Sequence, residues 1–121
     1  MRTLNSIRKT SVLIEKGGNS RILIPEFIDD FNSASVDDKT LMIQEAPIKM
    51  KRKHIEVYLA AVADFLCHRD NIKIPEWTKK LYLKKPYFYG GEKLKPILLI
   101  ESPVAFRRRN LFVSANAVMR V

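Results

Sequence analysis

The sequence predicts a mainly α-helical domain in which about six short helices pack around a central buried helix at residues 51–69. Within that segment, apolar residues recur at three- and four-residue steps around most of the helix, as is typical of a helix inside a core. The chain lacks the two-residue alternation expected of several sheet strands. Its 121 residues, 46% hydrophobic and 29% charged, have the size and balance of one globular domain spanning 1–121.

The first 20 residues leave two alternatives open. Ile7 and Ile14 are spaced for one face of a helix, whereas the run 11–14 also suits a strand. The glycine pair 17–18 marks a break after this segment. We therefore expect either a helix or a strand before this break, in an N-terminal segment, residues 1–20, that can also be a loosely ordered arm of the domain.

Two further helices are predicted before residue 48. Proline suits the first turn of a helix, because it lacks a backbone N–H, so the first of these helices is expected to begin close to Pro25. Its apolar face would be formed by Leu23, Phe27, Ile28 and Phe31. Ser35 is a typical N-cap residue, and Asp37 and Asp38 would lie in the first turn, where the helix dipole favours negative charge. This second helix is expected to end at Pro47.

The central helix carries two acidic residues, Glu56 and Asp64, on one narrow polar stripe. Buried carboxylates are costly unless they are paired. Three consecutive arginines, Arg107, Arg108 and Arg109, would point about 100° apart on a helix, so at least one should face the core. We therefore expect one of them to form a bidentate pair with Asp64 or Glu56.

The segment after the central helix is predicted to contain short helices and loops. Residues 72–75 are expected to be extended, because the residue before a proline avoids helix. Pro75 would open a short helix that contains Trp77, whose ring would complete the core. The aromatic and glycine-rich run 86–91 predicts a loop.

The C-terminal part is predicted to add further short helices. An apolar helix is expected over residues 93–101. Ser102 would cap the next helix, which begins with a proline and includes Phe106 in a structural role. A last turn or two of helix is predicted over residues 114–119.

Four segments together resemble a family of small, uncharacterised bacterial proteins. The resemblance covers roughly residues 24–121, and the motifs, which occur in the order expected of the family, are IPEFIDDF (24–31), YLAAVADFL (58–66), PEW (75–77) and ESPVAFRRRNLFV (101–113). In some relatives this region follows a helix-turn-helix DNA-binding domain, and the genes look like regulators or antitoxins beside a toxin gene. The resemblance therefore implies a regulatory or antitoxin-like role and supplies no catalytic residues. Residues 1–23 of this chain are too short for a helix-turn-helix domain.

The positive charge of this chain is unevenly distributed. The net charge is +9, yet residues 1–48 hold 6 Lys/Arg against 7 Asp/Glu, whereas residues 49–121 hold 16 against 6. Such a basic half attracts nucleic acid, acidic protein surfaces or phosphorylated ligands. The same charge can also serve solubility alone.

Two kinds of partner fit this charge. The first is an acidic protein, such as a toxin from a neighbouring gene, bound through the basic C-terminal half. The second is a nucleic acid, because lysines interleaved with aromatic side chains suit a single strand; the alternative for that segment is that its aromatics complete the core. The candidate contact residues are Lys51, Arg52, Lys53, Lys79, Lys80, Lys84, Lys85, Tyr87, Tyr89, Arg107, Arg108 and Arg109.

Neither an enzyme nor a membrane protein is expected. The sequence has no glycine-rich phosphate loop and no recognisable nucleophile signature, and it implies no cofactor. His54 lies 13 and 14 residues from Cys67 and His68 along one helix, about 20 Å away, so these side chains cannot share a metal ion. A single cysteine, with no signal peptide and no apolar run of roughly 20 residues, favours a cytoplasmic location.

Overall fold

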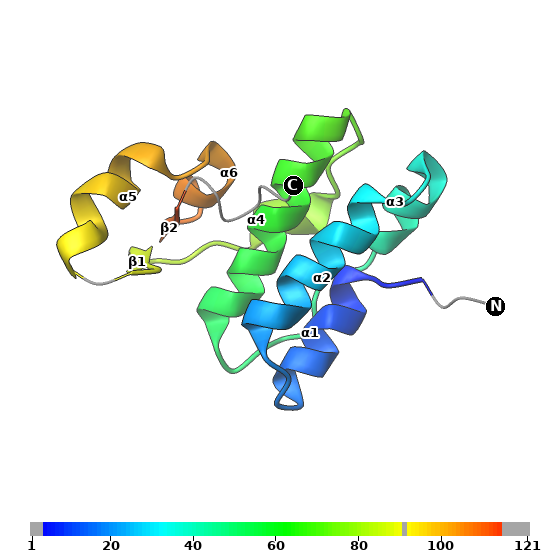
Figure 1. Ribbon diagram of the computed structural model, residues 1–121, viewed down its shortest axis with the longest axis horizontal. Helices are drawn as coiled ribbons and strands as arrows, with labels where there is room; N and C mark the ends of the chain where they lie inside the picture. The colour runs from blue at the N-terminus through cyan, green and yellow to red at the C-terminus, as the bar shows by residue number, and fades with distance from the viewer. Residues whose placement is uncertain (1–3, 91, 115–121) are drawn as a thin grey trace.

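The computed structural model describes residues 4–90 and 92–114 and is mainly α-helical, as predicted (Figure 1). Within these ranges the chain forms six α-helices, two 3₁₀ helices and one pair of short strands. The elements in chain order are α1 (Ile7–Glu15), α2 (Ser20–Asn32), α3 (Val36–Met42), α4 (Lys53–Asp70), η1 (Glu76–Lys80), β1 (Tyr87–Phe88), η2 (Glu92–Leu94), α5 (Lys95–Glu101), α6 (Val104–Arg107) and β2 (Leu111–Phe112). None of the helices in the described ranges combines the length and apolarity needed to cross a membrane.

The N-terminal segment, for which the sequence allowed more than one structure, contains a helix that packs into the core. The side chain of Ser6 caps α1 by accepting the N–H of Lys9, and Ile7 and Ile14 are fully buried. Helix α1 lies against α2 and α4, so residues 7–15 are not a loosely ordered arm. The turn that follows depends on Gly17, whose φ of 109° is unfavourable for any residue with a side chain.

Helix α2 begins earlier than predicted. It starts at Ser20, where the side chain of Asn19 accepts the N–H of Arg21, so Pro25 lies inside the helix rather than in its first turn. The early cap explains this start, because it satisfies a free donor before the proline is reached. The apolar face predicted for this helix is largely confirmed, with Phe27, Ile28 and Phe31 fully buried.

Helix α3 has the predicted start and a different end. The hydroxyl of Ser35 accepts the N–H of Asp38 at 3.2 Å, which confirms the predicted N-cap. The helix ends at Met42, however, and not at Pro47. Residues 43–52 then lead to the next helix without regular structure.

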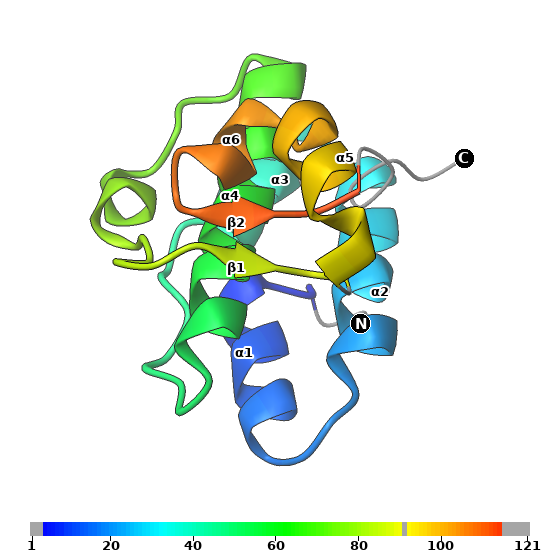
Figure 2. The ribbon, with the colours of Figure 1, turned by 90° about the vertical axis from the view of Figure 1, so that its left-hand side faces the viewer.

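Helix α4 packs against elements from both the N-terminal and the C-terminal parts of the chain. It begins at Lys53, two residues later than predicted, and its buried side chains lie around most of its circumference. It contacts α1, η1, α6 and β2, and Figures 1 and 2 show it passing between the N-terminal helices and the C-terminal elements. Asn71 ends it in the left-handed conformation, with φ of 56°, as helix C-termini often require.

The C-terminal elements contain a sheet that the sequence did not predict. Strands β1 and β2 pair in parallel, with Tyr87 opposite Leu111 and Phe88 opposite Phe112 (Figure 2). The prediction of a loop over 86–91 is therefore wrong for β1, because a strand of two residues is too short to show alternation.

The last helices differ from the prediction in how they are joined. Helix α5 is confirmed, but Ser102 does not cap α6. Its hydroxyl instead contacts the carbonyl of Leu98 and accepts the N–H of Val113, and thus ties α5 to the end of β2. The helix predicted over 114–119 lies, apart from its first residue, outside the described residues.

Candidate binding surfaces

The arginine triplet divides into three environments. Arg109 is buried, and its Nη1 donates to Oδ2 of Asp64 at 2.7 Å and to the carbonyl of Ala105 at 2.8 Å. Its Nη2 donates to the carbonyl of Thr78 at 2.9 Å. The predicted pair between an arginine and Asp64 is therefore confirmed. The predicted bidentate geometry is wrong, because Nη2 of Arg109 donates to the carbonyl of Thr78 in the 3₁₀ helix and not to Asp64.

The other two arginines remain on the surface. The Nη1 of Arg108 lies 3.6 Å from Oδ2 of Asp64, and its side chain is about half exposed. Arg107 is exposed and forms no ion pair with any described residue. Of the triplet, Arg107 is thus the side chain most available to a partner, whereas Arg109 is not available.

Asn110, which follows the arginine triplet, binds the segment that precedes β1. It adopts a left-handed conformation, with φ of 62°, and its Nδ2 donates to the carbonyl of Leu83 at 2.7 Å. Its own carbonyl accepts the N–H of Tyr87 at 2.8 Å, and the carbonyl of Arg109 accepts the N–H of Leu83. The most distinctive motif of the sequence therefore positions Tyr87.

The other residues expected to be structural are also placed in the core. Glu56 accepts the N–H of Met50 at 2.9 Å and lies 3.5 Å from Nζ of Lys53, so it does not meet the arginine triplet. Trp77 is half-buried and donates its Nε1–H to the carbonyl of Ile43. Phe106 is fully buried against Tyr58.

The predicted lysine–aromatic surface is split by the fold. Lys79 pairs with Glu76 and lines a shallow hollow with Tyr82 and Arg108. The remaining lysines of the segment are exposed: Lys80, Lys84 and Lys85. Tyr87 and Tyr89, by contrast, line a different pocket. The lysines and these two tyrosines therefore do not share one hollow.

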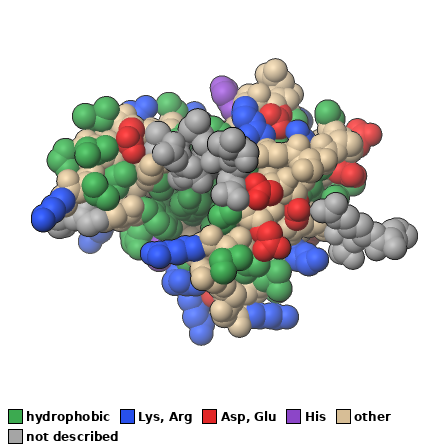
Figure 3. Space-filling model, viewed as in Figure 1, with side chains coloured by type: hydrophobic (Ala, Val, Ile, Leu, Met, Phe, Trp, Pro, Cys, Tyr) green, Lys and Arg blue, Asp and Glu red, His purple; other side chains and the backbone are tan. Residues whose placement is uncertain are grey.

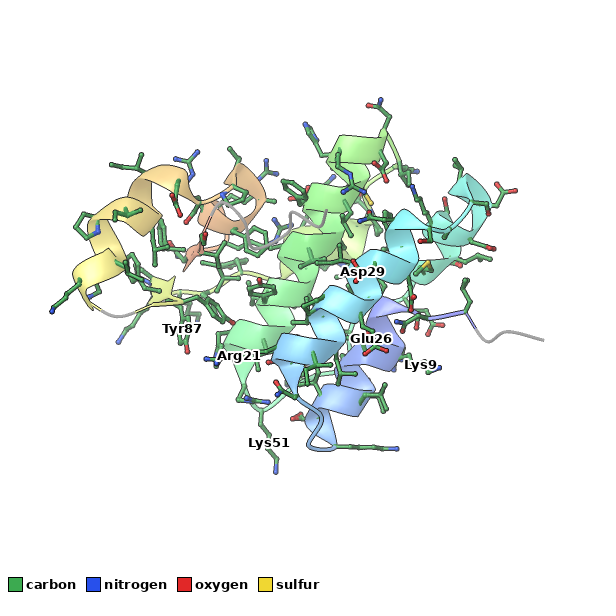
Figure 4. The ribbon with its side chains drawn as sticks, viewed as in Figure 1. Lys9, Arg21, Glu26, Asp29, Lys51 and Tyr87 are labelled. Carbon is green, nitrogen blue, oxygen red and sulfur yellow. The ribbon has the colours of Figure 1, made fainter. Side chains whose placement is uncertain are left out.

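The basic cluster before α4 is divided in the same way. Lys53 is held at 3.5 Å from Glu56, and the N–H of Lys51 is donated to Glu15. The side chain of Lys51 points away from the body of the molecule into solvent (Figure 4). Only Arg52 of the three lines the pocket that contains Tyr87 and Tyr89.

That pocket lies between the start of α2, the start of α4 and β1. Its volume is about 380 Å³, and the lining side chains that could bind a ligand are Arg21, Arg52, His54, Tyr58, Tyr87 and Tyr89. Figure 4 shows Arg21, from α2, and Tyr87, from β1, near the lower end of α4. Arg21, His54 and Tyr58 were not predicted as site residues, because only the packing of α2 beside α4 and β1 brings them together.

The aromatic side chains of the pocket support one another. The rings of His54 and Tyr87 stack at 4.2 Å between centroids, with 8° between their planes. Tyr89 meets the edge of Tyr87 at 4.9 Å, and the Tyr89 hydroxyl donates to the carbonyl of His54. Burial, together with the positive charge of Arg52, lowers the pKa of His54. Burial also raises the pKa of Tyr58 to about 12. Both groups are therefore neutral near pH 7.

A second surface is apolar and lies on the C-terminal elements. Helix α5 buries only Leu98 among its large apolar side chains. Five others on this part of the chain are exposed and define what we call the α5 face: Leu94, Ile97, Leu99, Ile100 and Val104. Figure 3 shows hydrophobic side chains gathered over this end of the molecule, with basic side chains at its edge.

The described residues bring no three potential metal-ligating side chains together. Comparison of the chain with protein-family models, with curated proteins and with solved structures found no match. The geometry and chemistry of the two surfaces are accordingly the basis for a functional assignment.

Proposed function

We propose that this protein is a non-enzymatic interaction protein that binds an acidic partner protein through the α5 face. The observation that carries the proposal is the exposure of this face, where Ile100 is 81% exposed and Ile97 51% exposed. Single exposed apolar residues are ordinary, but a group gathered on one short helix and the residues at its two ends is typical of a protein–protein contact.

The charge around the α5 face favours an acidic partner. Lys93 and Lys95 flank Leu94, and Arg107 follows Val104 by three residues in α6, whereas Glu101 is the one carboxylate of α5. A partner segment with apolar side chains at its centre and Asp or Glu at its edges would complement both the face and this basic rim. Of the residues proposed from the sequence, Arg107 is the one that belongs to this surface.

The C-terminal motif resembles a family of small, uncharacterised bacterial proteins, and the genes of some relatives look like regulators or antitoxins, which agrees with such a role. An antitoxin acts by occupying a partner and needs no catalytic group. In this chain the motif itself supplies Val104 and Arg107 to the surface, whereas its remaining arginines bind within the fold or close to Asp64. The neighbouring-gene product is therefore the first protein to test as the partner.

The experiment is a tagged pull-down from the host at low and moderate salt, with and without nuclease. Three forms are compared: the wild type, Ile100→Glu and Val36→Glu. Val36 is the matched control, because it is 68% exposed on α3, away from the α5 face. Both substitutions put a carboxylate at an exposed apolar position, so they differ in place and not in chemistry.

We expect one protein to be retained in stoichiometric amount by the wild type and by Val36→Glu, and to be lost with Ile100→Glu. Retention should survive nuclease and moderate salt, because an apolar contact is insensitive to screening. Equal retention by Ile100→Glu would contradict the proposal. So would a retained protein that is lost on nuclease treatment, because that protein would be held through nucleic acid and not by the α5 face.

A further inference from the structure

We propose that the pocket between α2, α4 and β1 binds a nucleotide, either free or as one residue of a single-stranded nucleic acid. This site is distinct from the α5 face and is independent of the protein partner proposed for that face. Its volume of about 380 Å³ lies in the range of small-ligand pockets, which begins at about 300 Å³.

The charge of the pocket suits a phosphate. Arg21 comes from α2 and Arg52 from the residue before α4, and both line the pocket. The lining contains no Asp or Glu, and neither guanidinium forms an ion pair with a residue in the described parts of the chain. Two unpaired arginines that converge on one hollow favour an anion, and the planar guanidinium group matches the oxygens of a phosphate.

The aromatic wall suits a base. His54 covers one face of the Tyr87 ring and Tyr89 meets its edge, yet Tyr87 remains 39% exposed. The ring is therefore held in place with part of its surface open to the pocket. Stacking of a base on such a ring favours binding whichever base it is, because each base has an aromatic face.

The two features together define the ligand class. A simple anion would use the arginines and leave the tyrosine wall without a role, and an uncharged aromatic would leave both guanidinium groups unpaired. A nucleotide carries a planar base and a phosphate on one scaffold, so it uses both sides of the pocket. Arg21, on α2, belongs to the arginine side of the pocket, and Tyr87, on β1, to the aromatic side; both are labelled in Figure 4.

The test measures binding of two probes to the purified full chain. Fluorescence anisotropy follows a short fluorescein-labelled oligothymidylate, and calorimetry follows adenosine monophosphate. The site variants are Arg52→Gln and Tyr87→Leu. Each has a control nearby in chemistry: Lys51→Gln removes an adjacent charge that points into solvent, and Tyr82→Leu removes a tyrosine that is 57% exposed outside the pocket. Circular dichroism establishes that all four variants are folded.

We expect Tyr87→Leu to weaken binding of the oligonucleotide roughly five-fold to more than a hundred-fold, as the loss of one stacked base does. Arg52→Gln should also weaken it about ten-fold, whereas Lys51→Gln and Tyr82→Leu should leave it within about two-fold. Binding of both probes would identify the free nucleotide as sufficient. Binding of the oligonucleotide alone would identify the single strand as the source. Either result supports the site.

Three results would overturn the inference. The first is no binding of either probe at low salt. The second is a loss of binding in Lys51→Gln equal to that in Arg52→Gln, because the contact would then be with the basic surface in general. The third is competition by inorganic phosphate or by a tyrosine-phosphorylated peptide at concentrations below those at which adenosine monophosphate competes.

Discussion

Arg107 and Arg109 are two residues apart in the sequence and have opposite environments. Arg109 is buried with three charge-assisted hydrogen bonds, whereas Arg107 faces solvent. The pairing with Asp64 could be predicted, because a carboxylate on a buried helix needs a partner. The choice of Arg109 could not, because it depends on the carbonyls of Thr78 and Ala105, which only the folded chain brings within reach.

Replacing Asp64 with alanine is expected to lower the free energy of unfolding by about 3–5 kcal/mol, because the guanidinium of Arg109 would stay buried without its carboxylate. Arg107→Ala is the control, with an expected change within about 0.5 kcal/mol for an exposed side chain. Urea unfolding followed by circular dichroism measures both. Equal stability of Asp64→Ala and the wild type would show that the buried pair contributes nothing.

Asp70 gives a prediction about pH. The hydrogen bonds from Arg69 and Lys39 hold the pKa of this carboxyl at about 2, below its ordinary value of 3.8. Between these values the unfolded chain binds the proton and the folded chain does not, so this contribution to stability is present above pH 4 and is lost toward pH 2. The stability difference between wild type and Asp70→Asn should therefore close over this range in unfolding curves. A gap of constant size from pH 5 to pH 2 would contradict this.

At the scale of elements, helix caps and apolar periodicity predicted the helices, whereas the contacts that join the elements could not be predicted. Ser35 and the apolar steps of α4 gave correct elements, because local hydrogen bonds and burial period decide them. The pairing of β1 with β2 was missed, because strands of two residues leave no alternation in the sequence. Ser102 was assigned to a cap, although its hydroxyl serves a tertiary contact instead.

Ser102→Ala tests that contact. The change would leave the buried N–H of Val113 without its acceptor, and we expect a loss of about 1–3 kcal/mol in the free energy of unfolding. Ser33→Ala is the control, because Ser33 is exposed at the end of α2. Chemical unfolding of the two variants in parallel provides the comparison, and similar midpoints would assign Ser102 no structural role.

At the scale of the whole molecule, the fold distributes the basic charge over several places. The sequence places the excess charge in residues 49–121, but the side chains reach the pocket, the edge of the α5 face and the buried pair with Asp64. The mainly α-helical class followed from the spacing of the apolar residues. The pocket could not be predicted, because Arg21 and Tyr87 become neighbours only when α2, α4 and β1 pack together.

Cys67 reports on the unfolding of the whole molecule. Its thiol is fully buried in α4, and burial, together with the charges of Asp64 and Asp70, raises its pKa to about 12. Iodoacetamide near pH 8 should therefore react only through opening of the core, and Asp64→Ala should accelerate this reaction. Mass spectrometry measures the rate, with the urea-unfolded chain as the fully reactive reference. Alkylation of the native protein at the reference rate would mean that the core is open.

The pair of Asp64 and Arg109 also has a consequence for synthesis on the ribosome. The two residues are separated by 45 positions, so the carboxylate leaves the ribosome well before its partner does. At about 5–20 residues per second, that interval lasts roughly 2–9 seconds. During this time Asp64 has no arginine to pair with, so burial of its carboxylate would be costly and that side of α4 should stay in water. Burial of this side of α4 therefore has to wait for the segment that contains Arg109.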